Sequence, residues 1–218
     1  MRKLFLLTIL FLTLVITHRS YAQFDAGADL VSSYIWRGTI LADGPSIQPW
    51  VSYSVGEENV TFEIGAWGSY TFFSLDGTKP PSEADIYATL GLGPISITLT
   101  DYFFPSLGEL YFDYDNGHIL EASVGAEFGG LSLLAAINIA GAIDDDNPGI
   151  YFEGAYAFDS GVSVFAGFGD EFYQAESFGL VNLGIGYEKE ILGGLPAFGQ
   201  VILNPEAESF GIVFGVSF

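Results

Sequence analysis

Carboxylates are the chemically capable side chains that this sequence has in quantity. Asp and Glu together number 27, against six Lys and Arg, two His and no Cys. Without cysteine the chain can form neither a disulfide nor a thiolate metal site. A chain this acidic repels nucleic acid, so we expect no nucleic-acid partner. What the carboxylates do then depends on the elements that position them.

A hydrolytic site would need a base, and His118 is the only candidate after the N-terminal segment. It follows Asp115 closely, and Ser106 is a nearby hydroxyl. Hydrolases and acyltransferases generally use histidine in this role. No nucleophile motif surrounds Ser106, so we expect no catalytic residues and no enzymatic activity.

A metal site would need clustered oxygen ligands, and Asp144, Asp145, Asp146 and Asn147 are the densest group. Calcium prefers such oxygen ligands. The run lacks the spaced pattern, the glycine and the terminal glutamate of a dedicated calcium loop. We interpret it as a solvated acidic loop, with divalent-ion contact to surface lipid as a further possibility, and expect no metal and no cofactor.

The first 22 residues have the features of an export signal. Arg2 and Lys3 precede an apolar run over residues 4–17, and small residues at Ser20 and Ala22 form a cleavage pattern. The apolar run is shorter than the roughly 20 residues of a transmembrane helix. We therefore predict a cleaved signal peptide over residues 1–22 and a single domain over residues 23–218.

Apolar and polar residues alternate with a period of two through the rest of the chain. In one window Ile86, Ala88 and Leu90 alternate with Tyr87 and Thr89. This period places the two sets on opposite faces of a strand. Twelve segments show it: 24–38, 45–55, 60–73, 83–92, 95–104, 118–128, 131–141, 149–158, 161–169, 177–188, 196–203 and 208–218.

These strands predict an all-β fold, a transmembrane up-and-down antiparallel β-barrel of about 12 strands, within a range of about 10–14. A soluble β-sandwich would also alternate, but only 15% of the residues are charged, too few for its surface. Tight connections alternate with longer or more acidic ones, as in barrels of the bacterial outer membrane. An even strand number then places both termini in the periplasm.

Aromatic residues near the strand ends predict two lipid-facing girdles. Phe24 would lie at the inner end of the first strand, and Tyr34 and Trp36 at its outer end. The terminal Phe218 closes an apolar stripe, similar to the signature that the barrel-insertion machinery binds. Outer-membrane lipid and that machinery are therefore expected partners.

Several segments resemble a known family in their order and spacing. They are Asp29–Gly38 (DLVSSYIWRG), Pro45–Pro49 (PSIQP), Gly65–Ser69 (GAWGS) and Glu83–Tyr87 (EADIY). Together they resemble the TorF-type family of outer-membrane porins over residues 26–90. The resemblance implies an outer-membrane β-barrel with a channel function, and it supplies no catalytic or ligand residues.

Parity predicts which side chains face the barrel interior, where polar groups need water or partners. Many are small, and we expect the following to line a pore: Arg37, Trp50, Glu63, Trp67, Asp85, Tyr87, Glu121 and Glu153. We therefore expect a channel for small hydrophilic solutes, in which the excess negative charge of the lumen favours cations over anions.

Three questions stay open at this point. Arg37 could clamp an anionic substrate or narrow the pore against its acidic wall, but we favour a structural ion pair with an acid on a neighbouring strand, such as Glu63, because buried cations are usually paired. Trp50 and Trp67 could stack a sugar or fill the lumen. The alternative to a channel is a plugged structural or adhesion barrel that acts through its acidic loops, and an outer-membrane hydrolase is the least favoured function.

Overall fold

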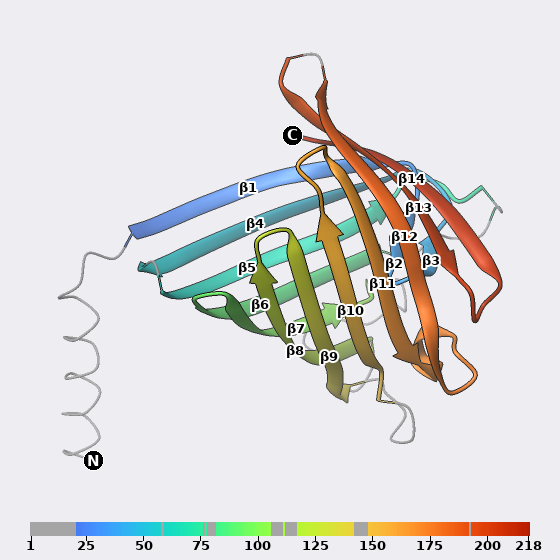
Figure 1. Ribbon diagram of the computed structural model, residues 1–218, viewed down its shortest axis with the longest axis horizontal. Helices are drawn as coiled ribbons and strands as arrows, with labels where there is room; N and C mark the ends of the chain where they lie inside the picture. The colour runs from blue at the N-terminus through green and yellow to red at the C-terminus, as the bar shows by residue number, and fades with distance from the viewer. Residues whose placement is uncertain are drawn as a thin grey trace.

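The computed structural model describes residues 21–57, 59–75, 77, 82–105, 111, 117–141, 148–191 and 193–218. Within these ranges, twelve antiparallel strands close into a barrel in which β1 pairs with β4 and with β14 (Figure 1). The remaining two strands, β2 and β3, form a separate hairpin. This architecture confirms the predicted all-β up-and-down barrel.

The bounds of the elements are as follows: β1 Tyr21–Val31, β2 Tyr34–Trp36, β3 Thr39–Ala42, β4 Ser46–Glu57, β5 Val60–Thr71, β6 Ser82–Leu92, β7 Ile95–Phe103, β8 His118–Phe128, β9 Leu131–Gly141, β10 Ile150–Ala157, β11 Val162–Asp170, the 3₁₀ turn η2 Glu171–Tyr173, β12 Phe178–Ile191, β13 Leu195–Asn204 and β14 Ser209–Ser217.

Eleven of the twelve predicted segments correspond to one barrel strand each, but the first is wrong at its C-terminal end. The predicted strand 24–38 stops at Val31, and the chain then leaves the barrel wall at Ser32. The Ser32 amide and hydroxyl still bind the backbone of Phe214, at 2.8 Å and 2.9 Å. Beyond this anchor the chain turns into the β2–β3 hairpin.

The outer face of the barrel is apolar all the way round. On β7, Ile95, Ile97 and Leu99 are 43–47% exposed, and they alternate with the inward-facing Ser96 and Thr98. Every barrel strand carries exposed large hydrophobic side chains of this kind. A continuous apolar belt is unfavourable in water and favourable in a bilayer. The strands therefore span a membrane.

The two rims of the barrel differ. Both β1 and β14 have their free ends at the rim where neighbouring strands are joined by tight turns; we call it the terminal rim. The longer connections, including the β2–β3 hairpin, leave from the opposite rim, the loop rim. Phe24, Phe128 and Phe218 are exposed near the terminal rim, and Tyr70 and Phe72 near the loop rim, as the girdles predict.

The predicted signal peptide lies outside the described residues, apart from Tyr21 and Ala22, which pair with Gly56 and Val55. The acidic run at residues 144–147 also lies outside them. No helix in the described part of the chain is long and apolar enough to cross a bilayer.

Candidate functional site

The β2–β3 hairpin lies inside the barrel, behind β11 and β12 in the view of Figure 1. Trp36 pairs with Thr39, so Arg37 and Gly38 form a two-residue turn. Both have positive φ angles, +49° and +83°, as a type I′ hairpin turn requires. A non-glycine residue rarely adopts this conformation, so other contacts must hold Arg37 there.

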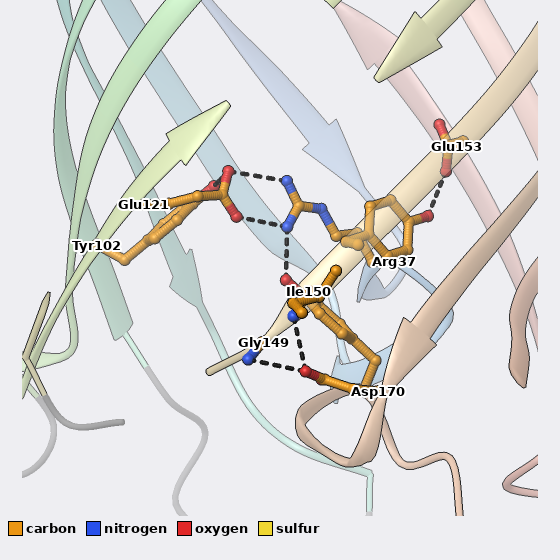
Figure 2. Close-up of polar contacts among 9 residues, drawn as sticks. Arg37, Tyr102, Glu121, Gly149, Ile150, Glu153 and Asp170 are labelled. Atoms are coloured by element: carbon orange, nitrogen blue, oxygen red, sulfur yellow. Dashed lines mark hydrogen bonds and ion pairs between the residues drawn. The ribbon is translucent and has the colours of Figure 1, made fainter. Parts of the chain in front are cut away.

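An ion pair across the lumen holds the hairpin tip. The Arg37 guanidinium donates from Nη1 and Nη2 to the two Glu121 carboxylate oxygens on β8, at 2.5 Å and 2.9 Å (Figure 2). Nη1 also donates to the Tyr173 hydroxyl at 2.7 Å. Only 10% of the Arg37 side chain and 2% of the Glu121 side chain are exposed. This is a buried bidentate pair, the strongest geometry available to arginine and carboxylate.

Aromatic rings enclose the same guanidinium. The Arg37 Cζ atom lies 4.7 Å from the ring centre of Trp36, 4.5 Å from that of Tyr151 and 5.6 Å from that of Tyr173. Burial raises the pKa of the Tyr173 phenol to about 12, despite the Arg37 charge beside it. The phenol is therefore neutral at physiological pH, and its oxygen accepts from Arg37.

Further hydrogen bonds orient this cluster. Tyr102 donates to Glu121 at 3.2 Å. Tyr151 donates to Glu153, which also accepts from the Asn182 amide at 2.8 Å. Glu153 thus holds the hydroxyl of Tyr151, the residue whose ring packs on the Arg37 guanidinium (Figure 2).

Asp170 fixes the position of Tyr173. Its carboxylate accepts from the backbone amides of Gly149 and Ile150, at 3.0 Å and 2.8 Å (Figure 2). It also caps the short turn η2 by accepting from Phe172 N at 3.1 Å. The cap places Tyr173 at the inner wall, where it is fully buried. Tyr173, which belongs to the connection between β11 and β12, thereby lines the lumen.

A second anchor lies at the base of the hairpin. The Tyr34 hydroxyl donates to Glu83 on β6 at 2.8 Å, and its ring lies 5.6 Å from that of Trp67. Burial and then the Glu83 charge raise the pKa of Tyr34 above its ordinary value, so the phenol remains a donor. Tyr34 and Glu83 are 7% exposed.

Substituting this donor tests the second anchor. We expect Tyr34→Phe to lower the free energy of unfolding by about 1–3 kcal/mol, because Glu83 would lose a partner while staying buried. The measurement is denaturant unfolding of the purified barrel in detergent. Tyr53→Phe is the matched control, since Tyr53 is exposed on the lipid face, and it should change stability by less than about 0.5 kcal/mol. Equal effects of the two substitutions would contradict the anchor.

Two sequence-based expectations are wrong here. Tyr34 and Trp36 do not extend the outer girdle, because the chain has left the wall and both rings pack inside the barrel. Arg37 forms the expected structural ion pair, but with Glu121 and not with Glu63. The reason is the same in both cases: the hairpin carries the tip across the lumen to β8.

The other candidate residues lie along the inner wall in separate groups. Trp50 and Trp67 are cross-strand partners, and Trp50 covers Gly27, where a Cβ would come within 2.7 Å of its ring. Tyr87 similarly covers Gly65. Glu63 is half-buried on β5, two residues before Gly65 on the same face of the strand.

Asp85 is buried and accepts from Phe103 N at 3.4 Å. The hairpin thus brings Arg37, Glu121 and, through Tyr151, Glu153 together. It does not bring Trp50, Glu63 or Tyr87 to that cluster.

His118 is part of a packed cluster at the loop rim. Its Nδ1 atom lies 2.8 Å from Asp101 Oδ1, and its ring stacks on Phe103 with centres 4.5 Å apart. Among the described residues, the carboxylate that it contacts is Asp101; Asp115 and Ser106 lie outside them.

The half of the lumen toward the terminal rim contains a cavity of about 280 Å³. Its lining includes Asp29, Ser163, Glu188, Gln200 and Ser217, from five different strands. No ion pair joins Asp29 or Glu188 to a cation within the described ranges. This part of the interior is polar, acidic and roomy enough for several water molecules.

Sequence reasoning missed the residues that receive the hairpin, namely Tyr102, Tyr151, Tyr173, Glu83 and Asp170. Tyr102 and Tyr151 face inward by the same parity that selected Glu121 and Glu153. The clue to the hairpin itself was Arg37–Gly38, a turn-compatible pair inside an apparent strand. No local signal indicates where its tip binds.

No family model matches this chain, and no curated protein matches it. Solved structures with a similar shape include mutants of the Rhodopseudomonas blastica porin. One has a TM-score of 0.44 at 10% sequence identity, covering 91% of this chain and 99% of that chain. Another has a TM-score of 0.42 at 11% identity with the same coverage. Identity this low says nothing about function.

Proposed function

We propose that this protein is an outer-membrane channel for small hydrophilic solutes, with an acidic lumen that favours cations and a hairpin that narrows the passage. The observation that carries the proposal is the polar interior of a lipid-facing barrel. Asp29, Glu188 and Gln200 line a cavity of about 280 Å³ inside a wall whose outer face is apolar. Unpaired carboxylates at membrane depth require water.

The charge of the interior sets the expected selectivity. Among the described inward-facing residues the one cation is Arg37, and Glu121 neutralises it. Glu63, Asp29 and Glu188 remain without a cationic partner in the described ranges. A water-filled passage with such a wall concentrates cations and repels anions.

Planar-bilayer recording under a salt gradient tests this proposal. We expect stepwise conductance with a cation-selective reversal potential, and we expect Asp29→Asn combined with Glu188→Gln to shift that potential toward zero. The control is Asp159→Asn, which removes a charge from an exposed turn on the same rim and should leave the potential unchanged. Strong anion selectivity of the unmodified protein would overturn the acidic-channel proposal.

The hairpin favours a second candidate, a plugged barrel that acts through its external loops. Ile35 packs against Val31, Ile202 and Val213, and Trp36 packs against the cluster around Tyr173, so the hairpin fills space near the loop rim. A silent bilayer, with folding verified by heat-modifiable gel mobility, would favour this candidate over the channel.

Localisation and family membership belong to the same proposal. The apolar belt supports insertion in the bacterial outer membrane, with the terminal rim in the periplasm. The segment Asp29–Gly38, which suggests the TorF-type family, forms the end of β1 and the first half of the hairpin. Phe218 is exposed, and its backbone exchanges two hydrogen bonds with Ala28 across the β1–β14 seam, at 2.8 Å and 3.0 Å. We therefore propose that the insertion machinery recognises Phe218 where β1 and β14 pair.

A further inference from the structure

An apolar groove of about 700 Å³ runs along the outer face of β13, near the terminal rim. Its floor is Gly199 and Ala197, which have little or no side chain. Gly199 pairs with Tyr187 on β12 and with Phe214 on β14, so two exposed aromatic rings form the walls. A Cβ on Gly199 would lie 3.3 Å from the Phe214 ring, so this ring packs directly against the groove floor.

One cation stands at the mouth of this groove. Lys189 lines it and pairs with Ala197, while Glu188 and Glu190 lie on the opposite face of the strand. Within the described ranges no acid forms an ion pair with Lys189. The other described cation, Arg37, is inside the lumen, so Lys189 is the positive charge that the described outer surface offers. The chain has 27 acidic residues, so a lysine at this groove gives it a positive charge that the rest of the described outer surface lacks.

The depth of Lys189 matches a lipid phosphate. Tyr187 belongs to the aromatic girdle, which lies at the boundary between hydrocarbon and headgroups. Lys189 is two residues farther along the same face of β12, about 7 Å toward the rim. Its ammonium therefore lies at headgroup level while the groove below it faces the acyl chains.

We propose that this groove binds one glycerophospholipid, with an acyl chain along Gly199 and Ala197 and the phosphate on the Lys189 ammonium. The charge complementarity decides the occupant. A second apolar groove of about 560 Å³ beside Ala135 has no Lys or Arg in its lining and supplies the internal comparison. If acyl chains filled apolar grooves without regard to charge, the two grooves would bind lipid equally well.

Native mass spectrometry of the purified barrel in non-ionic detergent tests the proposal, with dioleoylphosphatidylglycerol and dioleoylglycerol as probes. We expect one phosphatidylglycerol molecule to bind. Lys189→Gln should weaken that binding about fivefold, as expected for one basic residue at the headgroup level. Lys189→Arg should preserve it, and the dioleoylglycerol affinity should not respond to either substitution.

Two variants separate the groove from the rest of the surface. Ala197→Leu fills the floor and should weaken both lipids, whereas Ala135→Leu fills the comparison groove and should weaken neither. Equal phosphatidylglycerol affinity in the unmodified protein and Lys189→Gln would overturn the proposal. A dimer in lipid-free detergent that Ala197→Leu abolishes would overturn it too, because the occupant would then be a second copy of the chain. Channel conductance is read separately, so failure of one proposal leaves the other intact.

Discussion

Arg37→Ala is expected to lower the free energy of unfolding by about 3–5 kcal/mol, because it leaves the Glu121 carboxylate buried without a counter-ion. Glu121 is 2% exposed and receives both guanidinium hydrogen bonds, so water cannot replace the lost partner without rearrangement. The stacking on Trp36 and Tyr151 is lost as well. The measurement is denaturant unfolding in detergent micelles.

A double-mutant cycle attributes this loss to the pair itself. The double variant Arg37→Met with Glu121→Leu has neither charge. We expect it to be more stable than either single variant, because each single variant leaves one buried charge unpaired. Lys189→Gln in lipid-free micelles is the control for loss of a cation, since Lys189 is exposed and unpaired within the described ranges. Its effect should stay below about 0.5 kcal/mol. Additive effects of the two single substitutions at the pair would contradict the assignment.

The same variant reports on the passage. If the hairpin narrows the lumen, releasing its tip from Glu121 should raise the single-channel conductance of Arg37→Ala above that of the unmodified protein. A loss of stability with unchanged conductance would mean that the pair is structural and that the hairpin does not limit flow.

Gly38→Ala is expected to have an effect of similar size for a different reason. A Cβ at Gly38 would lie 1.9 Å from the Val181 carbonyl oxygen, which is backbone and cannot move aside. The residue also has φ +83°, a conformation that alone costs an L-residue about 1–2 kcal/mol. The tip must therefore withdraw from β12, and Arg37 must withdraw from Glu121 with it.

Gly93→Ala is the matched control for this second prediction. Gly93 also has positive φ, +60°, but no atom lies within 4 Å of its ideal Cβ position. It should show the conformational cost alone, about 1–2 kcal/mol in unfolding experiments. If Gly38→Ala costs no more than Gly93→Ala, the tip does not seat against Val181. In the Arg37→Ala background, Gly38→Ala should add little beyond that conformational cost, because both changes release the same contact.

The barrel could be predicted from the sequence because its signal is local. The side chains of Ile95, Ile97 and Leu99 alternate with polar ones in any strand that faces lipid on one side. Short turns such as the one at Gly93 carry their own conformational requirement. Neither feature needs information from distant parts of the chain, so the barrel class followed from the pattern, as did the strand positions other than the end of β1 at Val31.

Inward-facing residues were also predictable by parity, as the positions of Glu121, Glu153 and Trp67 illustrate. Their partners were not. Glu121 meets Arg37 across 84 positions of sequence, and Tyr173 meets it across 136. Such pairings depend on the curvature of the closed wall and on where a hairpin inside it points.

The hairpin marks the boundary between what the sequence alone determines and what the tertiary structure decides. Tyr34 and Trp36 have the same spacing whether they continue a strand toward lipid or turn inward, so periodicity places them equally well on a girdle or inside the lumen. The inward course is decided by the buried acids Glu83 and Glu121 and by the aromatic wall at Tyr173, which exists only once η2 is capped by Asp170. The alternation of the sequence determines which residues share a face of a strand. Long-range contacts, which form only when the barrel closes, decide whether that face meets lipid or the lumen.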